Sequence, residues 1–361
     1  MGVASGGPTG AGMRGRSCPI AYRYSPEELA SGAAFACETL YVVGGLYGNT
    51  VALEGVLERV GRERHAPVAV VFNGDFHWLD LDADEFMQVT ERVLAQNAIS
   101  GNVEAELAAT ADDAGCGCAY PEYIDDATVA RSNAIMARLR ESSRRYPKLI
   151  TRLAGLPQHL TVEVDGERVG IVHGDPESLA GWRLALEAME PGDPMLRREI
   201  RWRGAPTTAS DVANWFRRAG VRVFCSSHTG LPYAQDFLVD GRRHLVINNG
   251  AAGLANFRAS TCGVITRLSG QDEAPRDSLY GMTVGPLRCD AVPVDFDLDR
   301  WTERFLVQWP PRSPGYDAYF ARITRGTDFR LEQAARGNVD RFADRSPPKT
   351  VGRGAPATGA R

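Results

Sequence analysis

The sequence predicts an α/β protein whose sheets are covered by helices. Short β-branched runs bounded by Gly, Asp or Asn indicate buried strands. Segments between several of these runs carry apolar residues at spacings of three and four, which is typical of amphipathic helices. Strands alternate with helices early in the chain and follow one another closely later, so we expect the later part to be more antiparallel.

These patterns place the elements along the chain. Strands are predicted at residues 40–43, 68–72, 160–164, 169–172, 221–224 and 245–247, and helices at 51–60, 84–95, 127–139 and 209–219. We assign residues 17–300 to one domain and 301–346 to a C-terminal helical extension packed on it. Residues 1–16 and 347–361 are predicted to be disordered tails, because their small residues, Gly and Pro leave too little apolar content for a core.

Composition limits the classes of partner. With 43% hydrophobic residues and a formal net charge of -4, the chain has no global electrostatic reason to bind nucleic acid or an anionic membrane. It has no apolar segment long enough to cross a bilayer and no apolar N-terminal signal. Seven cysteines at scattered spacings do not predict a disulfide framework. We therefore expect a cytoplasmic protein with reduced thiols.

Polar clusters directly follow the predicted strands. Loops at strand ends hold ligands on a rigid frame in α/β folds, so these clusters mark the expected site. They occupy residues 44–49, 73–77, 101–104, 172–175, 226–230 and 248–253.

In order and spacing, these clusters resemble the calcineurin-like metallophosphoesterase family. The family motifs run D-x-H-G-N, G-D, G-N-H-[DE], H-G, G-H-x-H and N-P-G-S, and the match spans roughly residues 38 to 270. A single Gly-Asp match has little value, whereas five ordered matches after strands are specific. The resemblance implies a four-layer αββα sandwich, with two central mixed sheets flanked by helices and a cleft at the strand ends.

The resemblance also implies half of a two-metal site. Asp75 matches the bridging carboxylate, and Asn102, His173 and His228 match the other protein ligands of the second metal. Such a mixed O/N set suits one divalent ion per chain, namely Mn, Fe or Zn. The competing interpretation is structural, since Asp and Asn commonly cap turns or helices and buried His residues commonly bond to backbone.

The other half departs from the family pattern. Gly45, Tyr47 and Gly230 stand where three ligands of the first metal belong, and Val103 replaces a His that often donates a proton. We expect the two glycines to leave space or a close backbone approach at the old metal position, with room for a larger ligand. Tyr47 is a candidate catalytic residue, donating a hydrogen bond to phosphate or water.

Further candidates surround these positions. His77 is a second candidate catalytic residue, as an extra ligand or a phosphate contact if its loop turns inward; Asn49 and Asn249 are assigned to substrate binding. Asp175 either supplements the metal site or caps a helix starting near Ser178. The segment 116–126, which contains a lone C-x-C pair, is a candidate lid over the cleft.

The leading functional hypothesis is a metal-dependent hydrolase of a phosphomonoester or phosphodiester with a reduced, mononuclear site and a phosphorylated small-molecule substrate. The alternative is a catalytically silent relative that binds a phosphorylated ligand or a protein partner through the same cleft. Metal-dependent chemistry on a non-phosphate substrate is a third possibility, because fold does not determine reaction.

Overall fold

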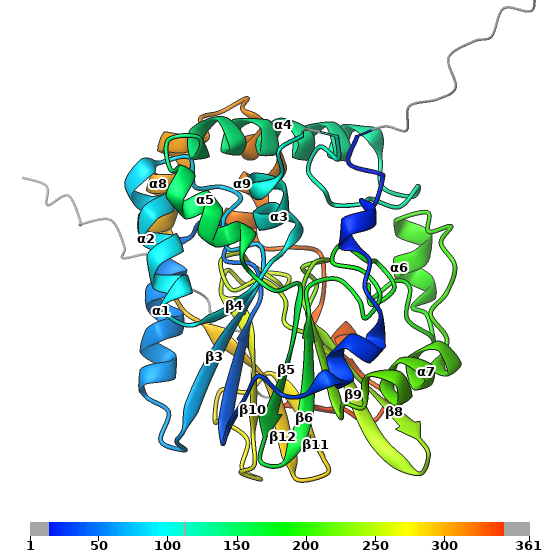
Figure 1. Ribbon diagram of the computed structural model, residues 1–361. Helices are drawn as coiled ribbons and strands as arrows, with labels where there is room; N and C mark the ends of the chain where they lie inside the picture. The colour runs from blue at the N-terminus through cyan, green and yellow to red at the C-terminus, as the bar shows by residue number, and fades with distance from the viewer. Residues whose placement is uncertain (1–13, 112, 343–361) are drawn as a thin grey trace, which may run out of the picture.

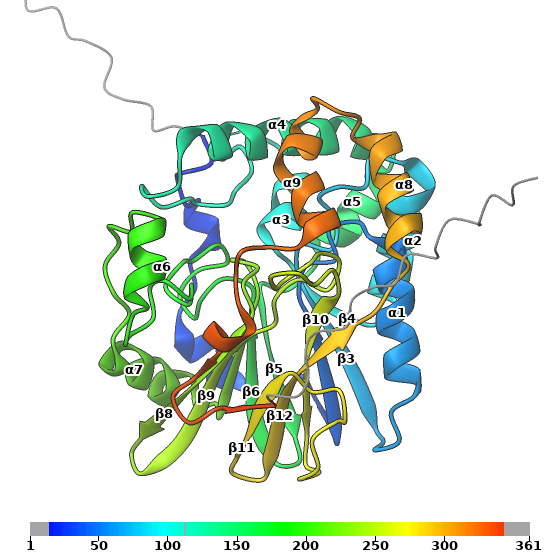
Figure 2. The ribbon, with the colours of Figure 1, turned by 180° about the vertical axis from the view of Figure 1, so that it is seen from behind.

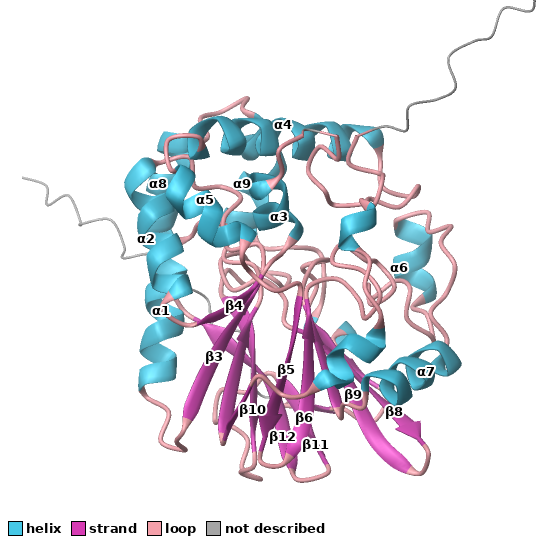
Figure 3. Cartoon of the chain, in the orientation of Figure 1, coloured by secondary structure: helices cyan, strands magenta, loops and turns pink. Residues whose placement is uncertain are grey.

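Two seven-stranded sheets form the centre of the molecule, and helices surround them (Figure 3). The structure is a computed structural model that describes residues 14–111 and 113–342. The first sheet has the order β1-β5-β6-β7-β9-β8-β13, and the second has the order β14-β11-β12-β10-β2-β3-β4. Both contain parallel and antiparallel pairs, which confirms the predicted mixed sheets flanked by helices.

The element bounds follow the chain order. The strands are β1 (Phe35–Cys37), β2 (Thr39–Val43), β3 (Val68–Asn73), β4 (Asn97–Ile99), β5 (His159–Val164), β6 (Glu167–Val172), β7 (Val223–Ser226), β8 (Tyr233–Val239), β9 (Arg242–Asn248), β10 (Gly263–Ser269), β11 (Tyr280–Val284), β12 (Leu287–Val294), β13 (Ala335–Arg336) and β14 (Asp340–Arg341). The helices are α1 (Thr50–Gly61), α2 (Ala83–Leu94), α3 (Asn102–Ala108), α4 (Asp126–Ser143), α5 (Pro147–Ala154), α6 (Pro194–Glu199), α7 (Ala209–Ala219), α8 (Leu298–Gln308) and α9 (Pro314–Arg325). All six predicted strands and all four predicted helices are confirmed within a few residues.

Burial on both faces of the second sheet explains why β2 and β3 are apolar at almost every position. Along β2, Leu40 and Val42 face the core shared with the first sheet, whereas Tyr41 and Val43 face the core beneath the helices. Successive side chains of a strand point to opposite faces, so packing on both sides favours apolar residues at successive positions. In Figure 1, α1 and α2 lie at one side of the strands, α6 and α7 at the other, and α4 runs across the top.

The C-terminal extension is less helical than predicted. Its helices α8 and α9 pack on the body, with α8 against α1 and α9 against α4 (Figure 2). Beyond them, β13 pairs with β8 in the first sheet and β14 pairs with β11 in the second. The segment therefore covers one edge of each sheet, where unpaired backbone N–H and C=O groups would otherwise be exposed.

The predicted tails fall mostly outside the described residues, which exclude 1–13 and 343–361. Residues 14–16 lie against the body. There, the Gly15 N–H donates to the Ala114 carbonyl, and Arg16 pairs with Asp126 at 2.6 Å. None of the helices in the described ranges has the length and apolar content that a membrane crossing requires.

Strand direction brings the predicted site loops to one edge of both sheets. β2, β3 and β4 are mutually parallel in the second sheet, and β6, β7 and β9 are parallel in the first. Their carboxyl ends therefore share an edge, where the two sheets also contact one another. The Nδ1 atom of His173, after β6, lies 2.8 Å from the Asn73 carbonyl at the end of β3.

Candidate metal centre

Four side chains from four separate loops converge at this edge. We call Asp75, Asn102, His173 and His228 the ligand cluster. The Nε2 atom of His173 lies 3.4 Å from Asp75 Oδ2, 3.3 Å from Asn102 Oδ1 and 3.3 Å from His228 Nδ1. His173 is fully buried, and Asp75 and Asn102 are nearly so. The structure thus brings together all four residues that the sequence assigned to one metal.

Each member of the ligand cluster is oriented by a backbone group that engages its other polar atom. The ring N–H groups of the histidines donate to carbonyls, His173 Nδ1 to Asn73 at 2.8 Å and His228 Nε2 to Cys118 at 3.0 Å. The Asn102 amide nitrogen donates to the Cys116 carbonyl at 2.9 Å. Asp75 Oδ1 accepts the Val103 N–H at 3.2 Å. The remaining polar atom of each side chain faces the centre of the cluster, which gives two oxygens and two imidazole nitrogens there. Hydrogen bonds of this kind orient the side chains of metal ligands in proteins.

The spacing of these atoms fits one ion. Two donor atoms that each lie about 2.1 Å from a tetrahedral ion are about 3.4 Å apart, close to the separations in the cluster. The ligand atoms of Asp75, His173 and His228 all lie within 4.8 Å of one another, so this group can bind a metal ion. Burial lowers the pKa of His228 to about 4, which keeps its ring neutral and able to act as a ligand.

A buried carboxylate that the sequence argument did not assign holds the Asp75 loop. Glu104 accepts backbone N–H groups from Asp75 at 2.7 Å and Gly101 at 2.9 Å through one oxygen, and from Phe76 at 3.1 Å and His77 at 3.3 Å through the other. Asp75 itself has a positive φ of 52°, which is uncommon for a residue with a side chain. The three hydrogen bonds from Asp75, Phe76 and His77 to Glu104 therefore fix a turn that is unfavourable in isolation.

The place of the missing first-metal ligands is filled, which corrects the expectation of open space. A side chain at Gly45 would collide with the ring of Tyr47, because its first carbon would lie 2.7 Å from Cε2. At Gly230, the same carbon would lie 3.3 Å from the Tyr47 hydroxyl and 3.8 Å from Nη1 of Arg322. The glycines make room for a phenol ring within the chain, not for a larger ligand.

A cavity of about 190 Å³ opens next to the ligand cluster. Besides Asp75, Asn102 and His228, it is lined by aromatic side chains, a thiol and one guanidinium, namely Tyr47, Trp78, Cys118, Tyr120, Trp182, Tyr319 and Arg322, together with Val103 and Thr229. Burial raises the pKa of the Tyr47 hydroxyl, so this group stays protonated and can donate a hydrogen bond. Tyr47 is the one predicted catalytic residue that reaches the cavity.

The segment predicted as a lid forms part of the cavity wall. The Cys118 carbonyl accepts both His228 Nε2 at 3.0 Å and the Trp182 indole N–H at 2.8 Å. Cys118 and Tyr120 line the cavity with their side chains. Burial raises the pKa of both groups well above the usual range, so neither is ionised near neutral pH.

The structure does not bring His77 to the ligand cluster. Its Nδ1 lies 2.6 Å from Asp80, its Nε2 lies 3.0 Å from the Thr90 hydroxyl, and its ring stacks on Phe86 at 4.0 Å. Both nitrogens are thus occupied in a fully buried environment beneath α2. The condition set for a catalytic role, a loop that turns His77 inward, is not met.

Replacing His77 with Ala is expected to lower the free energy of unfolding by about 3 kcal/mol, through a cavity and a buried Asp80 left without its partner. The metal content of the protein should stay that of the wild type. Denaturant unfolding and elemental analysis measure the two quantities, and the exposed His65→Ala variant is the control. Loss of metal from a folded His77→Ala protein would show that His77 contributes to metal binding.

The remaining candidates have structural contacts. Asn49 caps α1 by accepting the Val51 and Ala52 N–H groups, and its amide nitrogen donates to the Gly253 carbonyl. Asn249 is fully buried and accepts the Thr266 hydroxyl at 2.7 Å. Neither lines the cavity. Asp175 accepts the N–H groups of Glu177 and Arg183, and no helix begins near Ser178 within the described chain.

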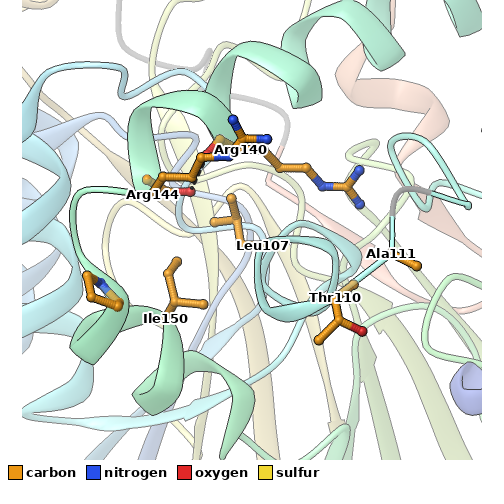
Figure 4. Close-up of a pocket in the computed structure, with 9 residues that line it drawn as sticks. Leu107, Thr110, Ala111, Arg140, Arg144 and Ile150 are labelled. Carbon is orange, nitrogen blue, oxygen red and sulfur yellow. Dashed lines mark hydrogen bonds between the residues drawn. The ribbon is translucent and has the colours of Figure 1, made fainter.

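A second cavity, of about 340 Å³, lies between α3, α4 and α5, lined in part by Leu107, Arg140 and Ile150 (Figure 4). It shares none of its described lining residues with the cavity at the ligand cluster. This second cavity is therefore separate from the ligand cluster.

Comparison with known proteins supports the fold. The sequence matches no family model and no curated protein. Among solved structures, hypothetical protein PH1004 from Pyrococcus horikoshii OT3 superposes with a TM-score of 0.53 at 15% identity, covering 81% of this chain and 99% of that one. A metallophosphoesterase from Sphaerobacter thermophilus superposes with a TM-score of 0.48 at 16% identity, covering 81% and 100%.

A protein serine/threonine phosphatase from Saccharomyces cerevisiae superposes with a TM-score of 0.38 at 14% identity, covering 74% of this chain and 86% of that one. Of these three superpositions, the one on PH1004 has a TM-score above 0.5, and it covers most of this chain. At these identities the likeness concerns the fold alone, so the chemistry of the site has to be argued from its own residues.

Proposed function

We propose that this protein is a metal-dependent hydrolase of small phosphoesters that uses one divalent ion, Mn, Fe or Zn, held by the ligand cluster. The observation that carries this proposal is the orientation of all four ligands by backbone groups, with two oxygens and two nitrogens left facing one point. A mixed set of this kind suits borderline transition metals. A bound ion supplies charge stabilisation at a phosphoryl oxygen and a lowered pKa of water.

Hydrolysis would join the oxygen of water to phosphorus and break the ester P–O bond, and the alcohol would leave with a proton. The cavity holds no group suited to donating that proton. Val103 has no ionisable group. Burial raises the pKa values of the cavity's other ionisable donors far above neutrality, namely those of Tyr47, Cys118, Tyr120 and Tyr319. The chain can therefore bind and orient the phosphoryl group, but the leaving group has to depart with little help.

This arrangement predicts a strong preference for activated esters. We expect an aryl phosphate, whose phenolate is a good leaving group, to be hydrolysed at least about a hundredfold faster than an alkyl phosphate of similar size, because general acid assistance contributes roughly 10²–10⁴ where it is present. Steady-state kinetics with both esters, each before and after removal of metal by a chelator, would measure the ratio. Equal rates on both esters would show that a general acid is present.

A second candidate function is binding of a phosphorylated ligand without turnover. The filling of the first-metal position by Tyr47 favours it, because the usual two-metal clamp on the transferred phosphoryl group is incomplete. One equivalent of metal with no hydrolysis of either ester, together with saturable binding of inorganic phosphate, would support this function over the first.

A further inference from the structure

Arg322 is the guanidinium that lines the cavity at the ligand cluster, and it comes from α9 in the C-terminal extension. Two backbone carbonyls hold it in place. Its Nε donates to Ala255 at 2.8 Å, and its Nη2 donates to Gly230 at 3.1 Å. These carbonyls belong to the loops after β9 and β7, and the loop after β7 also carries His228, so α9 is tied to the edge of the sheets at which the ligands lie.

The other terminal nitrogen of Arg322 has no protein partner. Among the described residues, Arg322 forms no ion pair with a carboxylate, and Nη1 has no hydrogen-bond acceptor. Nη1 lies beside the position of a Gly230 side chain, at 3.8 Å, and the Tyr47 hydroxyl lies 3.3 Å from the same point. Tyr47 is 9% exposed, and its hydroxyl also lacks a hydrogen-bond partner in the described chain. Two unsatisfied donors, one of them cationic, thus lie side by side on one wall of the cavity.

Their position coincides with the missing half of the metal site. Gly45 and Gly230 stand where first-metal ligands belong in the resembling family, and the Tyr47 ring and the Arg322 guanidinium occupy the space that those glycines leave. A guanidinium is a permanent cation whose N–H groups match the oxygens of phosphate, so it can supply charge where an ion is lost.

We propose that Arg322 and the Tyr47 hydroxyl form an oxyanion subsite that binds the phosphoryl group of the substrate in place of the first metal. The proposal rests on the proposed phosphoester function and deepens it, because it assigns the phosphoryl oxygens to two named donors. It also gives the C-terminal extension a role, since α9 completes the substrate site. The chemical class of ligand is a phosphate or phosphomonoester dianion, which can accept from both donors at once.

The test is calorimetric binding of inorganic phosphate to the full chain, with metal and after chelation. The variants are Arg322→Gln, Arg322→Lys and Tyr47→Phe, with Arg325→Gln as the control, because Arg325 is exposed on the same helix. We expect Arg322→Gln to raise the Kd for phosphate at least tenfold, which corresponds to about 1.4 kcal/mol. Arg322→Lys should recover part of that loss through its charge, and Tyr47→Phe should raise the Kd about threefold. Arg325→Gln should bind like the wild type.

The readouts separate the subsite from the hydrolase proposal. Metal content should be equal in all variants, because none of these side chains belongs to the ligand cluster. Equal phosphate affinity in wild type and Arg322→Gln would overturn the subsite while leaving the hydrolase intact. Arg322-dependent phosphate binding in a protein that takes up no Mn, Fe or Zn when the ion is supplied would support the subsite and overturn the hydrolase. If Arg322→Gln fails to fold, Tyr47→Phe decides, since it removes one oxygen; unchanged affinity there would remove Tyr47 from the subsite.

Discussion

Replacing His228 with Ala is expected to reduce bound metal from about one equivalent per chain to below about a tenth, which is the largest effect we predict on the site. His228 supplies Nδ1 to the cluster, 3.3 Å from His173 Nε2, and its low pKa keeps that nitrogen unprotonated. Its ring also lines the cavity, as the side chains of Asp75 and Asn102 do. His173→Ala should have the same result, with an added loss of stability because His173 is fully buried.

The measurement is elemental analysis of protein purified without chelator, joined to thermal unfolding with and without chelator. Metal that binds only the folded state stabilises it, by about 2.7 kcal/mol at a free ion concentration of 100 Kd. Chelation should therefore lower the melting temperature of the wild type and of the exposed His65→Ala control, and leave that of His228→Ala unchanged. Full metal occupancy in His228→Ala would place the ion elsewhere.

The ligand cluster could be predicted from the sequence because its members follow strands. The sheet fixes the position of a side chain at the carboxyl end of a parallel strand. Once β3 and β6 were assigned as strands, Asp75 and His173 were therefore expected to lie close together. The cores were predictable for a related reason. Runs such as Val70, Val71 and Phe72 are apolar at every position, which indicates burial on both faces.

The direction of side chains in the turns could not be predicted. His77 lies two residues after Asp75. The positive φ of Asp75 and the backbone hydrogen bonds to Glu104 turn the chain so that His77 packs against Phe86. Such a turn depends on a carboxylate 29 residues away from Asp75 in sequence, and no local pattern records it. In the same way, the Tyr47 ring folds back over Gly45.

Contacts that distant segments of the chain make with the site could not be predicted from the sequence either. Arg322 lies 92 residues from Gly230, to which it donates, and nothing in the helical pattern of 314–325 distinguishes it from the other arginine there, Arg325. The carbonyls of Cys116 and Cys118 orient Asn102 and His228, but every residue has a carbonyl, so side-chain motifs give no signal of that role. Tertiary packing decides these contacts.

Glu104→Gln is expected to lower the free energy of unfolding by about 3 kcal/mol and to weaken metal binding at least about tenfold. Both oxygens of Glu104 accept backbone N–H groups, two each. An amide of the same shape would turn one of these acceptors into a donor that faces two N–H groups in a fully buried site. Burial and the nearby Asp75 charge raise the pKa of Glu104, so the ionised carboxylate depends on those four donors.

The weaker metal binding follows from the Asp75 turn. When the backbone hydrogen bonds to Glu104 are weakened, Asp75 can leave the positive φ that directs its Oδ2 toward His173 Nε2. The cluster then loses its only charged oxygen ligand. Denaturant unfolding and metal titration measure the two effects, with Glu91→Gln on the exposed side of α2 as the control. A Gln variant that kept its stability but lost metal would limit Glu104 to an electrostatic role. One that kept both would show that the turn is held by other contacts.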